Sequence, residues 1–250
     1  MAIESFDRSI VHRATSTAVT FRKDVPGVRS NVEIVDLWED LGRGSEGYVS
    51  RVGVFSSRAP EKRVKLAYKQ FHDEHSIYLP YDQLFENYAR IKEAGIPVPQ
   101  TFRALDDEKG LLITDLTEDG KNVVASSADL SPNKIALLYE REPNLMHQLS
   151  NGEDIYSSRQ KDIVAGYIDA AVNARLVMRA DTWMAIIKPG GEVSYVACDM
   201  GQVSKFASPH IKDEKTILQK FNKYQFDWLW NRVKVLQQYG TNPEAIRDLF

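Results

Sequence analysis

Three glycines near the start of the chain have a spacing that suits a phosphate-binding turn. The stretch LGRGSEGYVSRVGV at residues 41–54 contains the pattern G-x-G-x-x-G at Gly42, Gly44 and Gly47, and Val49 follows two residues later. A turn without side chains lets backbone N–H groups approach phosphate oxygens closely. Glycines also gather wherever a chain bends, so the pattern taken alone favours an ordinary turn. The remaining sequence has to distinguish these two interpretations.

Further along the chain, a cation and three carboxylates could take part in the same chemistry. Lys69 follows Gly47 by 22 residues, Glu86 comes next, and Asp181 and Asp199 lie 18 residues apart, the second within CDMGQ. A lysine can neutralise phosphate, and an aspartate can hold a metal ion or accept a proton. Each also has a plainer interpretation. Exposed lysines are common, a helix glutamate can lie on a solvated face, and D-x-G is a common turn.

The elements that would position these residues follow from the hydrophobic pattern. Two alternating segments, NVEIVDLWEDLG and YVSRVGVF, flank the glycines and predict a β-hairpin. RVKLAYKQF predicts a third strand that carries Lys69. PYDQLFENYARIKEA at residues 80–94 predicts an amphipathic helix, because its apolar residues recur at spacings of four and three between Pro80 and Gly95. LLITDL predicts a short buried strand.

The second half of the chain has a different pattern. The segments SPNKIALLYEREPNLMHQL, SRQKDIVAGYIDAAVNARLVM and PHIKDEKTILQKFNKYQFDWLWNRVKVLQQYG predict helices, and EVSYVACDMG predicts a strand. We therefore expect a sheet-rich part at residues 1–116 and a helix-rich part at residues 117–250. Residues 1–30 are polar and irregular, and they predict either a short strand or a loosely held arm.

Composition excludes several classes of protein. The 250 residues include 43% hydrophobic and 27% charged residues, which is ordinary for a folded chain. The net charge of −3 argues against a dedicated nucleic-acid binder. Cys198 is the single cysteine, so no internal disulfide can form, and this fits a reducing compartment. No apolar run of about 18 residues occurs, so no membrane span is expected. We expect a cytoplasmic protein.

Taken in order, these features resemble the protein kinase fold, including its small atypical members of the RIO-type and aminoglycoside-phosphotransferase-like kinases. GRGSEGYV matches the glycine-rich loop, and AYKQF matches the strand of the phosphate-binding lysine. EAGIPVP is similar to a stretch of RIO-type kinases, LLITDL looks like a hinge strand, and DMG stands where kinases have D-F-G. The resemblance covers roughly residues 35–205 and rests on the order of the motifs. It implies an α+β fold with two lobes, an antiparallel-sheet N-terminal lobe with one helix and a reduced, mainly helical C-terminal lobe.

The resemblance also implies roles for residues in the first half of the chain. The three glycines and Val49 would cover a nucleotide, and Lys69 would bind its inner phosphates. Glu86 would hold Lys69 by an ion pair, although Asp82 and Glu93 are rival acids on the same predicted helix. Backbone groups of Asp115 and Leu116 would meet the adenine, and the Asp115 carboxylate could equally cap a turn.

Two aspartates would act in the second half. Asp181 would orient or deprotonate the acceptor hydroxyl, and Asp199 would bind the Mg²⁺ that bridges the phosphates of ATP. Trp183 and Met184, close after Asp181, would line the acceptor site or pack under the loop. Within FDWLWNRVKVL the apolar residues predict helix core, and an exposed tryptophan there would indicate a partner surface.

The segment VMRADTWMAII departs from the kinase pattern. Arg179 and Ala180 replace the histidine and arginine of H-R-D, and Ile186 stands five residues after Asp181, where kinases have a metal-binding asparagine. An isoleucine cannot bind a metal ion, and Gln202 is a conceivable substitute.

Three interpretations of function follow. In the first, the chain is an ATP- and Mg²⁺-dependent phosphotransferase, acting on a hydroxyl of a protein or a small molecule. In the second, it is a pseudokinase that binds a nucleotide or a partner and transfers nothing. In the third, it is an unrelated binding domain with chance motif matches. No A-P-E segment follows the DMG motif, which points to an atypical family.

Overall fold

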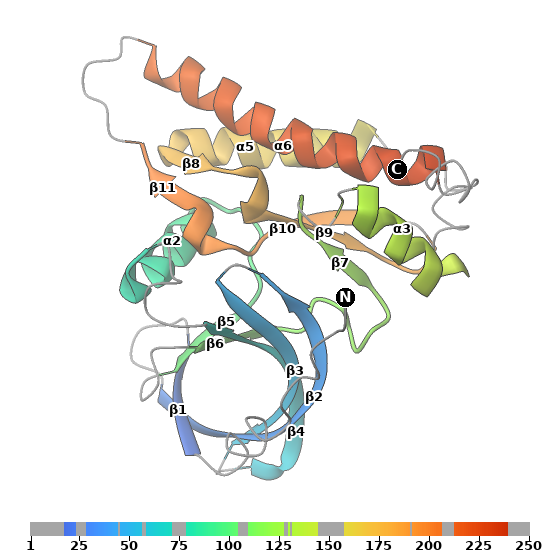
Figure 1. Cartoon of the computed structure of the whole chain (residues 1–250). Coiled ribbons are helices and arrows are strands. Elements are labelled where there is room, and N and C mark those ends of the chain that lie inside the picture. Colours follow the sequence, from blue (N-terminus) through green and yellow to red (C-terminus); the bar gives the residue numbers. More distant parts are fainter. Residues whose placement is uncertain are drawn as a thin grey trace. The chain divides into compact units, whose positions relative to one another are not determined.

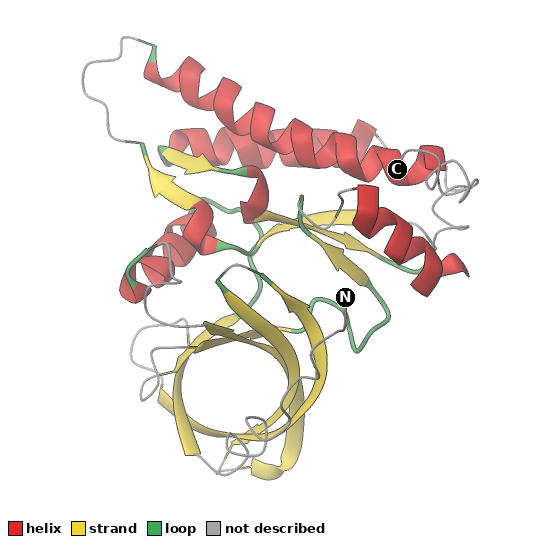
Figure 2. Cartoon of the chain, in the orientation of Figure 1, coloured by secondary structure: helices red, strands yellow, loops and turns green. Residues whose placement is uncertain are grey.

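The computed structural model divides into two compact units. It describes residues 18–23, 29–44, 46–56, 59–71, 79–104, 110–127, 130, 132–144, 158–190, 192–206 and 213–239. The first unit comprises Met1–Tyr81 with Pro99–Asp115, and the second comprises Asp82–Val98 with Leu116–Phe250. Figure 1 labels the elements and Figure 2 distinguishes helices from strands. The chain is thus a mixed α/β protein whose strand pairs, in the described residues, are all antiparallel.

The first unit is a closed antiparallel barrel, which Figure 1 shows nearly end-on. The strands follow one another around the barrel in the order β1-β2-β3-β4-β6-β5. Pairing of β1 with β5 closes it, so that every strand has two neighbours and no edge is left open. The strands are β1 Ala18–Lys23, β2 Arg29–Arg43, β3 Gly47–Ser56, β4 Ala59–Phe71, β5 Thr101–Ala104 and β6 Gly110–Thr114.

The structure confirms the predicted strands of this unit and adds the closure. The hairpin about the glycines is β2–β3, the predicted third strand is β4, and LLITDL contributes β6. Three register shifts interrupt the pairing of β2 with β3, which is how a long strand bends around a barrel. Of the two alternatives for residues 1–30, the strand is correct for residues 18–23, while residues 1–17 lie outside the described part.

Within its described residues, the second unit combines four helices with short strands. The predicted helix at residues 80–94 is confirmed as α2 Tyr81–Glu93, and it leads into this unit. The other described helices are α3 Pro132–Arg141, α5 Ser158–Asn173 and α6 Glu214–Tyr239, so each of the three helical segments predicted downstream contains a helix. The second prediction was wrong at its end, because Leu176–Met178 form the strand β8, which pairs with a distant segment. None of the described helices is long and apolar enough to cross a membrane.

Short strands in the second unit were mostly missed by the hydrophobic pattern. β7 Val123–Ala125, β9 Trp183–Ile187 and β10 Val193–Ala197 form a sheet in the order β10-β9-β7, and β8 Leu176–Met178 pairs with β11 Val203–Lys205. Two single turns of 3-10 helix, η1 Ala180–Thr182 and η2 Met200–Gln202, precede β9 and β11. Only β10 was predicted. β7, β8 and β11 have three residues each, which is too few positions to display alternation, and the five residues of β9 are almost all apolar.

Helix α6 holds the second unit together through one buried face. Leu218, Phe226, Leu229 and Val233 on that face are almost completely buried. Asn222 lies among them, and it is satisfied by the backbone of β8. Its Nδ2 donates to the carbonyl of Leu176 at 2.8 Å, and its Oδ1 accepts the N–H of Met178 at 2.9 Å. This pair of hydrogen bonds fixes the strand that leads into η1.

Candidate functional site

The glycine stretch forms the turn of the β2–β3 hairpin in the barrel unit. The N–H of Gly44 donates to the carbonyl of Gly47 at 2.9 Å, and the N–H of Gly42 donates to Oδ1 of Asp40 at 3.0 Å. A Cβ added at Gly42 or Gly44 would meet nothing within 4 Å. The turn therefore presents open backbone at these two positions, while both of their N–H groups already have acceptors.

The last glycine of the pattern is required by packing, whatever the turn binds. A Cβ at Gly47 would lie 2.0 Å from the carbonyl oxygen of Gln70 on β4. We expect Gly47→Ala to lower the free energy of unfolding by about 2 kcal/mol, because backbone atoms must shift to admit the methyl group. Urea denaturation followed by circular dichroism measures this, with Gly44→Ala as the matched control that keeps wild-type stability. Equal stabilities of the two variants would contradict the packing argument.

The register of the barrel brings together several residues predicted to bind a nucleotide. Gly42 on β2 pairs with Val49 on β3, and Val49 pairs with Lys69 on β4. Directly paired residues of neighbouring strands point to the same face of a sheet. Val49 and Lys69 are therefore side-by-side neighbours next to the glycine turn.

Lys69 has a carboxylate partner that the sequence analysis missed. Its Nζ lies 2.6 Å from Oε2 of Glu46, which belongs to the glycine turn itself. The ion pair is largely shielded from water, with 20% of the Lys69 side chain and 8% of the Glu46 side chain exposed. The sequence did contain an indication of this pair, because GRGSEG includes an acidic residue, Glu46, beside the strand that carries Lys69. The kinase pattern leaves that position unspecified.

Glu86 lies in the second unit, on the exposed side of α2. Its side chain is 60% exposed, and its Oε2 accepts a hydrogen bond from Nη2 of Arg90 at 3.1 Å. The rival acids Asp82 and Glu93 are exposed on the same helix. The pairing of Glu86 with Lys69 stays a prediction.

A buried asparagine ties α2 to the DMG segment, and sequence reasoning missed it as well. Asn87 is 0% exposed, and its Nδ2 donates to the carbonyls of Met200 at 3.1 Å and Val203 at 2.9 Å. The residue shares the buried side of α2 with Leu84 and Tyr88. A polar residue within an apolar helix face was the sequence indication, because such a residue needs a partner when it is buried.

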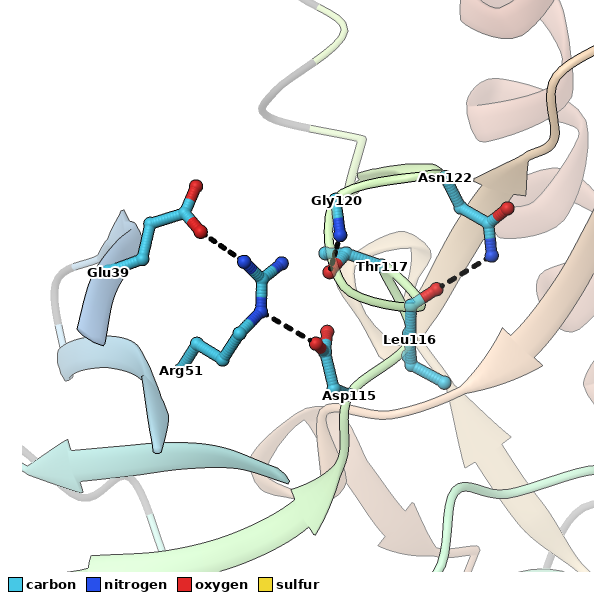
Figure 3. A network of polar contacts seen from close by, with 7 residues as sticks. All are labelled: Glu39, Arg51, Asp115, Leu116, Thr117, Gly120 and Asn122. Atoms are coloured by element: carbon cyan, nitrogen blue, oxygen red, sulfur yellow. Dashed lines mark hydrogen bonds and ion pairs between the residues drawn. The ribbon is translucent and has the colours of Figure 1, made fainter. Parts of the chain in front are cut away.

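The carboxylate of Asp115, at the end of β6, is engaged within the barrel unit. Figure 3 shows Nε of Arg51 bonded to Oδ2 of Asp115, at 2.8 Å, and Nη1 of Arg51 bonded to Glu39. Only 6% of the Arg51 side chain and 4% of the Asp115 side chain are exposed. The carboxylate of Asp115 is therefore bonded within the barrel unit. If adenine binds at this position, the backbone groups of Asp115 would make the contact.

Leu116 begins the second unit in a compact turn, also drawn in Figure 3. Nδ2 of Asn122 donates to the carbonyl of Leu116 at 3.1 Å, and the N–H of Gly120 donates to Oγ1 of Thr117 at 3.1 Å. The turn leads into β7. The carbonyl of Leu116 thus already has one donor.

Asp181 lies on η1 and is oriented by a buried serine. The hydroxyl of Ser127 donates to Oδ1 of Asp181, and Ser127 is 1% exposed. Pairing of Ala125 on β7 with Ala185 on β9 brings the two residues together. One carboxylate oxygen is held in this way, which fixes how Asp181 presents its other oxygen.

The turn that carries Asp181 is joined directly to the turn that carries Asp199. The carbonyl of Thr182 accepts the N–H groups of both Cys198, at 2.8 Å, and Asp199, at 3.3 Å. In return, Oγ1 of Thr182 donates to the carbonyl of Gln202 at 3.2 Å. The two aspartates predicted for acceptor and metal chemistry therefore lie on adjoining turns of the second unit.

Ile186 lies on a strand, whereas its distance of five residues from Asp181 suggested a position in a loop. Ile186 lies within β9, paired with Ser194 on β10 and with Val124 on β7. Strand β9 begins at Trp183, so Thr182 is the single residue between Asp181 and the strand. Ile186 therefore lies on a strand paired on both sides, and Thr182 is the residue that contacts the backbone of Asp199.

Trp183 belongs to the core, which settles the choice left open for it. It is 1% exposed, stacks with Tyr167 at 6.4 Å between ring centroids and meets the edge of Phe226 at 5.9 Å. Tyr195 also packs against Phe226, and burial raises the pKa of its hydroxyl group. The apolar wall proposed for an acceptor therefore cannot include Trp183, while Met184 is half-buried.

The donor groups near Asp199 suit a metal ion that arrives with phosphate. Oδ1 of Asp199 accepts the N–H of Gly201 at 3.1 Å. The described residues contain no group of three or more His, Cys, Asp or Glu residues that could hold a metal ion. Mg²⁺ is usually bound by one or two carboxylates together with substrate phosphates, so Asp199 fits that mode of binding.

Comparisons with known proteins give structural similarities of low degree. No protein-family model matches the chain, and no curated protein matches its sequence. One similar structure is the ROP18 kinase domain in complex with AMP-PNP and sucrose, with 12% identity, a TM-score of 0.44 and coverage of 91% of this chain and 72% of that one. Another is ROP2 from Toxoplasma gondii, described as a virulence factor with a protein kinase fold and no enzymatic activity, with 9% identity, a TM-score of 0.44 and coverage of 90% and 71%. At these values the similarities carry no conclusion about the ligands or activity of this chain.

Proposed function

We propose that the chain is an atypical kinase-like phosphotransferase, which transfers the γ-phosphate of Mg-ATP to a hydroxyl group of a protein or a small molecule. The barrel unit supplies phosphate-binding groups, namely the glycine turn and Lys69. The second unit supplies Asp181 for the acceptor hydroxyl and Asp199 for Mg²⁺. Phosphoryl transfer depends mainly on positioning and charge neutralisation, and Lys69 together with a metal ion on Asp199 would supply the positive charge.

The observation that carries this proposal is the junction of the two aspartate turns. Thr182 accepts hydrogen bonds from two consecutive N–H groups of the DMG segment, and Ser127 orients Asp181 from the other side. An acceptor base and a metal ligand need a fixed mutual position, because small displacements slow phosphoryl transfer severely. A chance D-x-G turn would not require such a connection to a second aspartate far away in the sequence.

A pseudokinase is the second candidate, and separate observations favour it. The N–H groups of Gly42 and Gly44 already have acceptors, and Ile186 stands five residues after Asp181, where the resemblance to kinases calls for an asparagine. In this alternative, the chain binds a nucleotide or a partner protein without transferring phosphate. The two candidates differ in turnover and agree in their use of Lys69.

Replacement of Lys69 tests the proposal directly. We expect Lys69→Met to reduce consumption of the γ-phosphate of ATP about a hundredfold, because it removes a cation that neutralises developing charge. Calorimetry measures the binding of Mg-ATP to the full chain, and release of labelled γ-phosphate measures turnover. Melting curves show whether each variant is folded. The matched control is Lys65→Met, which changes an exposed lysine on the same strand.

Each outcome has a distinct meaning. If the wild type binds no Mg-ATP, both the phosphotransferase and the nucleotide-binding pseudokinase are wrong. If it binds Mg-ATP without turnover over a broad panel of acceptors, the pseudokinase is correct. If Lys69→Met unfolds while Lys69→Met with Glu46→Gln stays folded, the buried glutamate accounts for the unfolding and the double variant replaces the single one in the assay.

A further inference from the structure

Glu46 is a carboxylate buried inside a turn that is expected to receive phosphate. It is 6% exposed, and Oε2 lies 2.6 Å from Nζ of Lys69. Its other oxygen, Oε1, is fully buried and has no hydrogen-bond partner among the described residues. A buried carboxylate with one oxygen unsatisfied is only partly stabilised, because that oxygen lost its water and gained nothing.

A second acid of the same hairpin occupies a second anion-binding group. Oδ1 of Asp40 accepts the N–H of Gly42 at 3.0 Å. The ammonium of Lys69 and the N–H of the first glycine are two of the groups predicted to contact phosphate. Each of these two groups is already bonded to a carboxylate of the chain, Lys69 to Glu46 and Gly42 to Asp40. The turn therefore carries negative charge at two positions that are predicted to contact phosphate.

We propose that Glu46 competes with nucleotide phosphate for Lys69 and thereby sets the affinity of the chain for ATP. This inference rests on the proposed function. A phosphate group placed at Lys69 would lie next to the Glu46 carboxylate, and two anions in a shielded site repel each other strongly. Glu46 must therefore leave Lys69 as phosphate arrives. Release into water would also satisfy Oε1, the oxygen that has no partner among the residues that the structure describes.

The opposite role makes the opposite prediction. If Glu46 were the carboxylate that holds Lys69 extended for catalysis, as the resemblance assigns to Glu86, its removal would weaken nucleotide use. A competitor raises the apparent dissociation constant of the nucleotide, and a positioning partner lowers it. The sign of the change in affinity therefore decides between them.

The first test is the binding of Mg-ATP to Glu46→Gln, which keeps the size of the side chain and removes its charge. We expect the dissociation constant to fall about tenfold, as for the weakening of one charge-assisted hydrogen bond. Calorimetry on the full chain measures it, and Glu142→Gln, an exposed acid after α3, is the control for charge alone. Unchanged or weaker binding by a folded Glu46→Gln chain overturns the inference.

The second test needs no nucleotide, and it separates this inference from the proposed function. Lys69 is labelled with acetic anhydride, and its rate of modification relative to Lys65 is read by mass spectrometry. We expect Glu46→Gln to raise that relative rate several-fold, because the carboxylate that covers the ammonium is neutralised. An unchanged rate overturns the pairing in solution. A raised rate, with no ATP bound by any variant, would leave Glu46 as the partner of Lys69 and would refute the nucleotide function.

Discussion

Asp199→Asn is expected to lower consumption of the γ-phosphate about a thousandfold while the chain stays folded. The expected size is that of removing a main electrostatic contact to the transferring phosphoryl group. Asparagine keeps an oxygen that can accept the N–H of Gly201, so the turn of η2 retains its cap. The variant removes the charge that we propose to bind Mg²⁺, and a neutral amide is a weaker ligand than a carboxylate.

The dependence on Mg²⁺ identifies the cause of the loss. Initial rates are measured over a range of Mg²⁺ concentrations at saturating ATP, and the variant should need a much higher concentration to reach its smaller maximum. Asp162→Asn, an exposed acid on α5, serves as the matched control and should behave as the wild type. A variant with unchanged rate and unchanged Mg²⁺ dependence would show that Asp199 is only the cap of a turn.

Arg51→Met is expected to lower the free energy of unfolding by about 3 to 5 kcal/mol, because it breaks a buried ion pair and removes the positive charge beside the buried carboxylate of Asp115. Both side chains of the Arg51–Asp115 pair are more than nine-tenths buried. Methionine fills much of the volume of arginine, so the effect reports mainly on the loss of the Arg51 charge beside Asp115. Denaturation in urea measures the change, and a loss below about 1 kcal/mol would contradict the burial of this pair.

A double variant separates the lost pairing from the lost packing. Arg51→Met with Asp115→Leu removes both charges, and it should recover most of the stability, because apolar replacement of a whole buried pair is often neutral. Lys223→Met is the control for an ordinary surface pair. Its Nζ lies 2.5 Å from Asp227, but the side chains are 58% and 31% exposed. We expect that control to lose less than about 1 kcal/mol.

The elements that carry the first half of the candidate site were predictable because their causes are local. Alternation on both sides of the glycines predicts β2 and β3, and helical periodicity between Pro80 and Gly95 predicts α2. The same patterns place Val49 and Lys69 on strands, and the hairpin then makes Gly42 and Val49 neighbours. Each of these features is set by residues of one segment or of two neighbouring segments, so its pattern can be recognised in the sequence.

The strands of the second unit were mostly not predictable. β7, β8 and β11 have three residues each, and they are strands only because a distant segment pairs with them. The same holds for the barrel, which closes when β1 pairs with β5 some 80 residues later in the chain. Pairing partners far apart leave no periodic trace in a short segment, so the hydrophobic pattern is silent about them.

By itself the sequence indicated which residues are of a type that could act chemically, namely the glycines of the turn, Lys69, Asp181 and Asp199. It also predicted the hairpin around the glycines and the strand that carries Lys69. The tertiary structure alone decided their partners. It places Glu46 on Lys69, Arg51 on Asp115 and Ser127 on Asp181, and it joins the aspartate turns through Thr182. The physical reason is that side-chain type and local periodicity are properties of a segment, whereas a buried charge or a backbone carbonyl takes whichever partner the packing of distant segments brings within hydrogen-bonding distance.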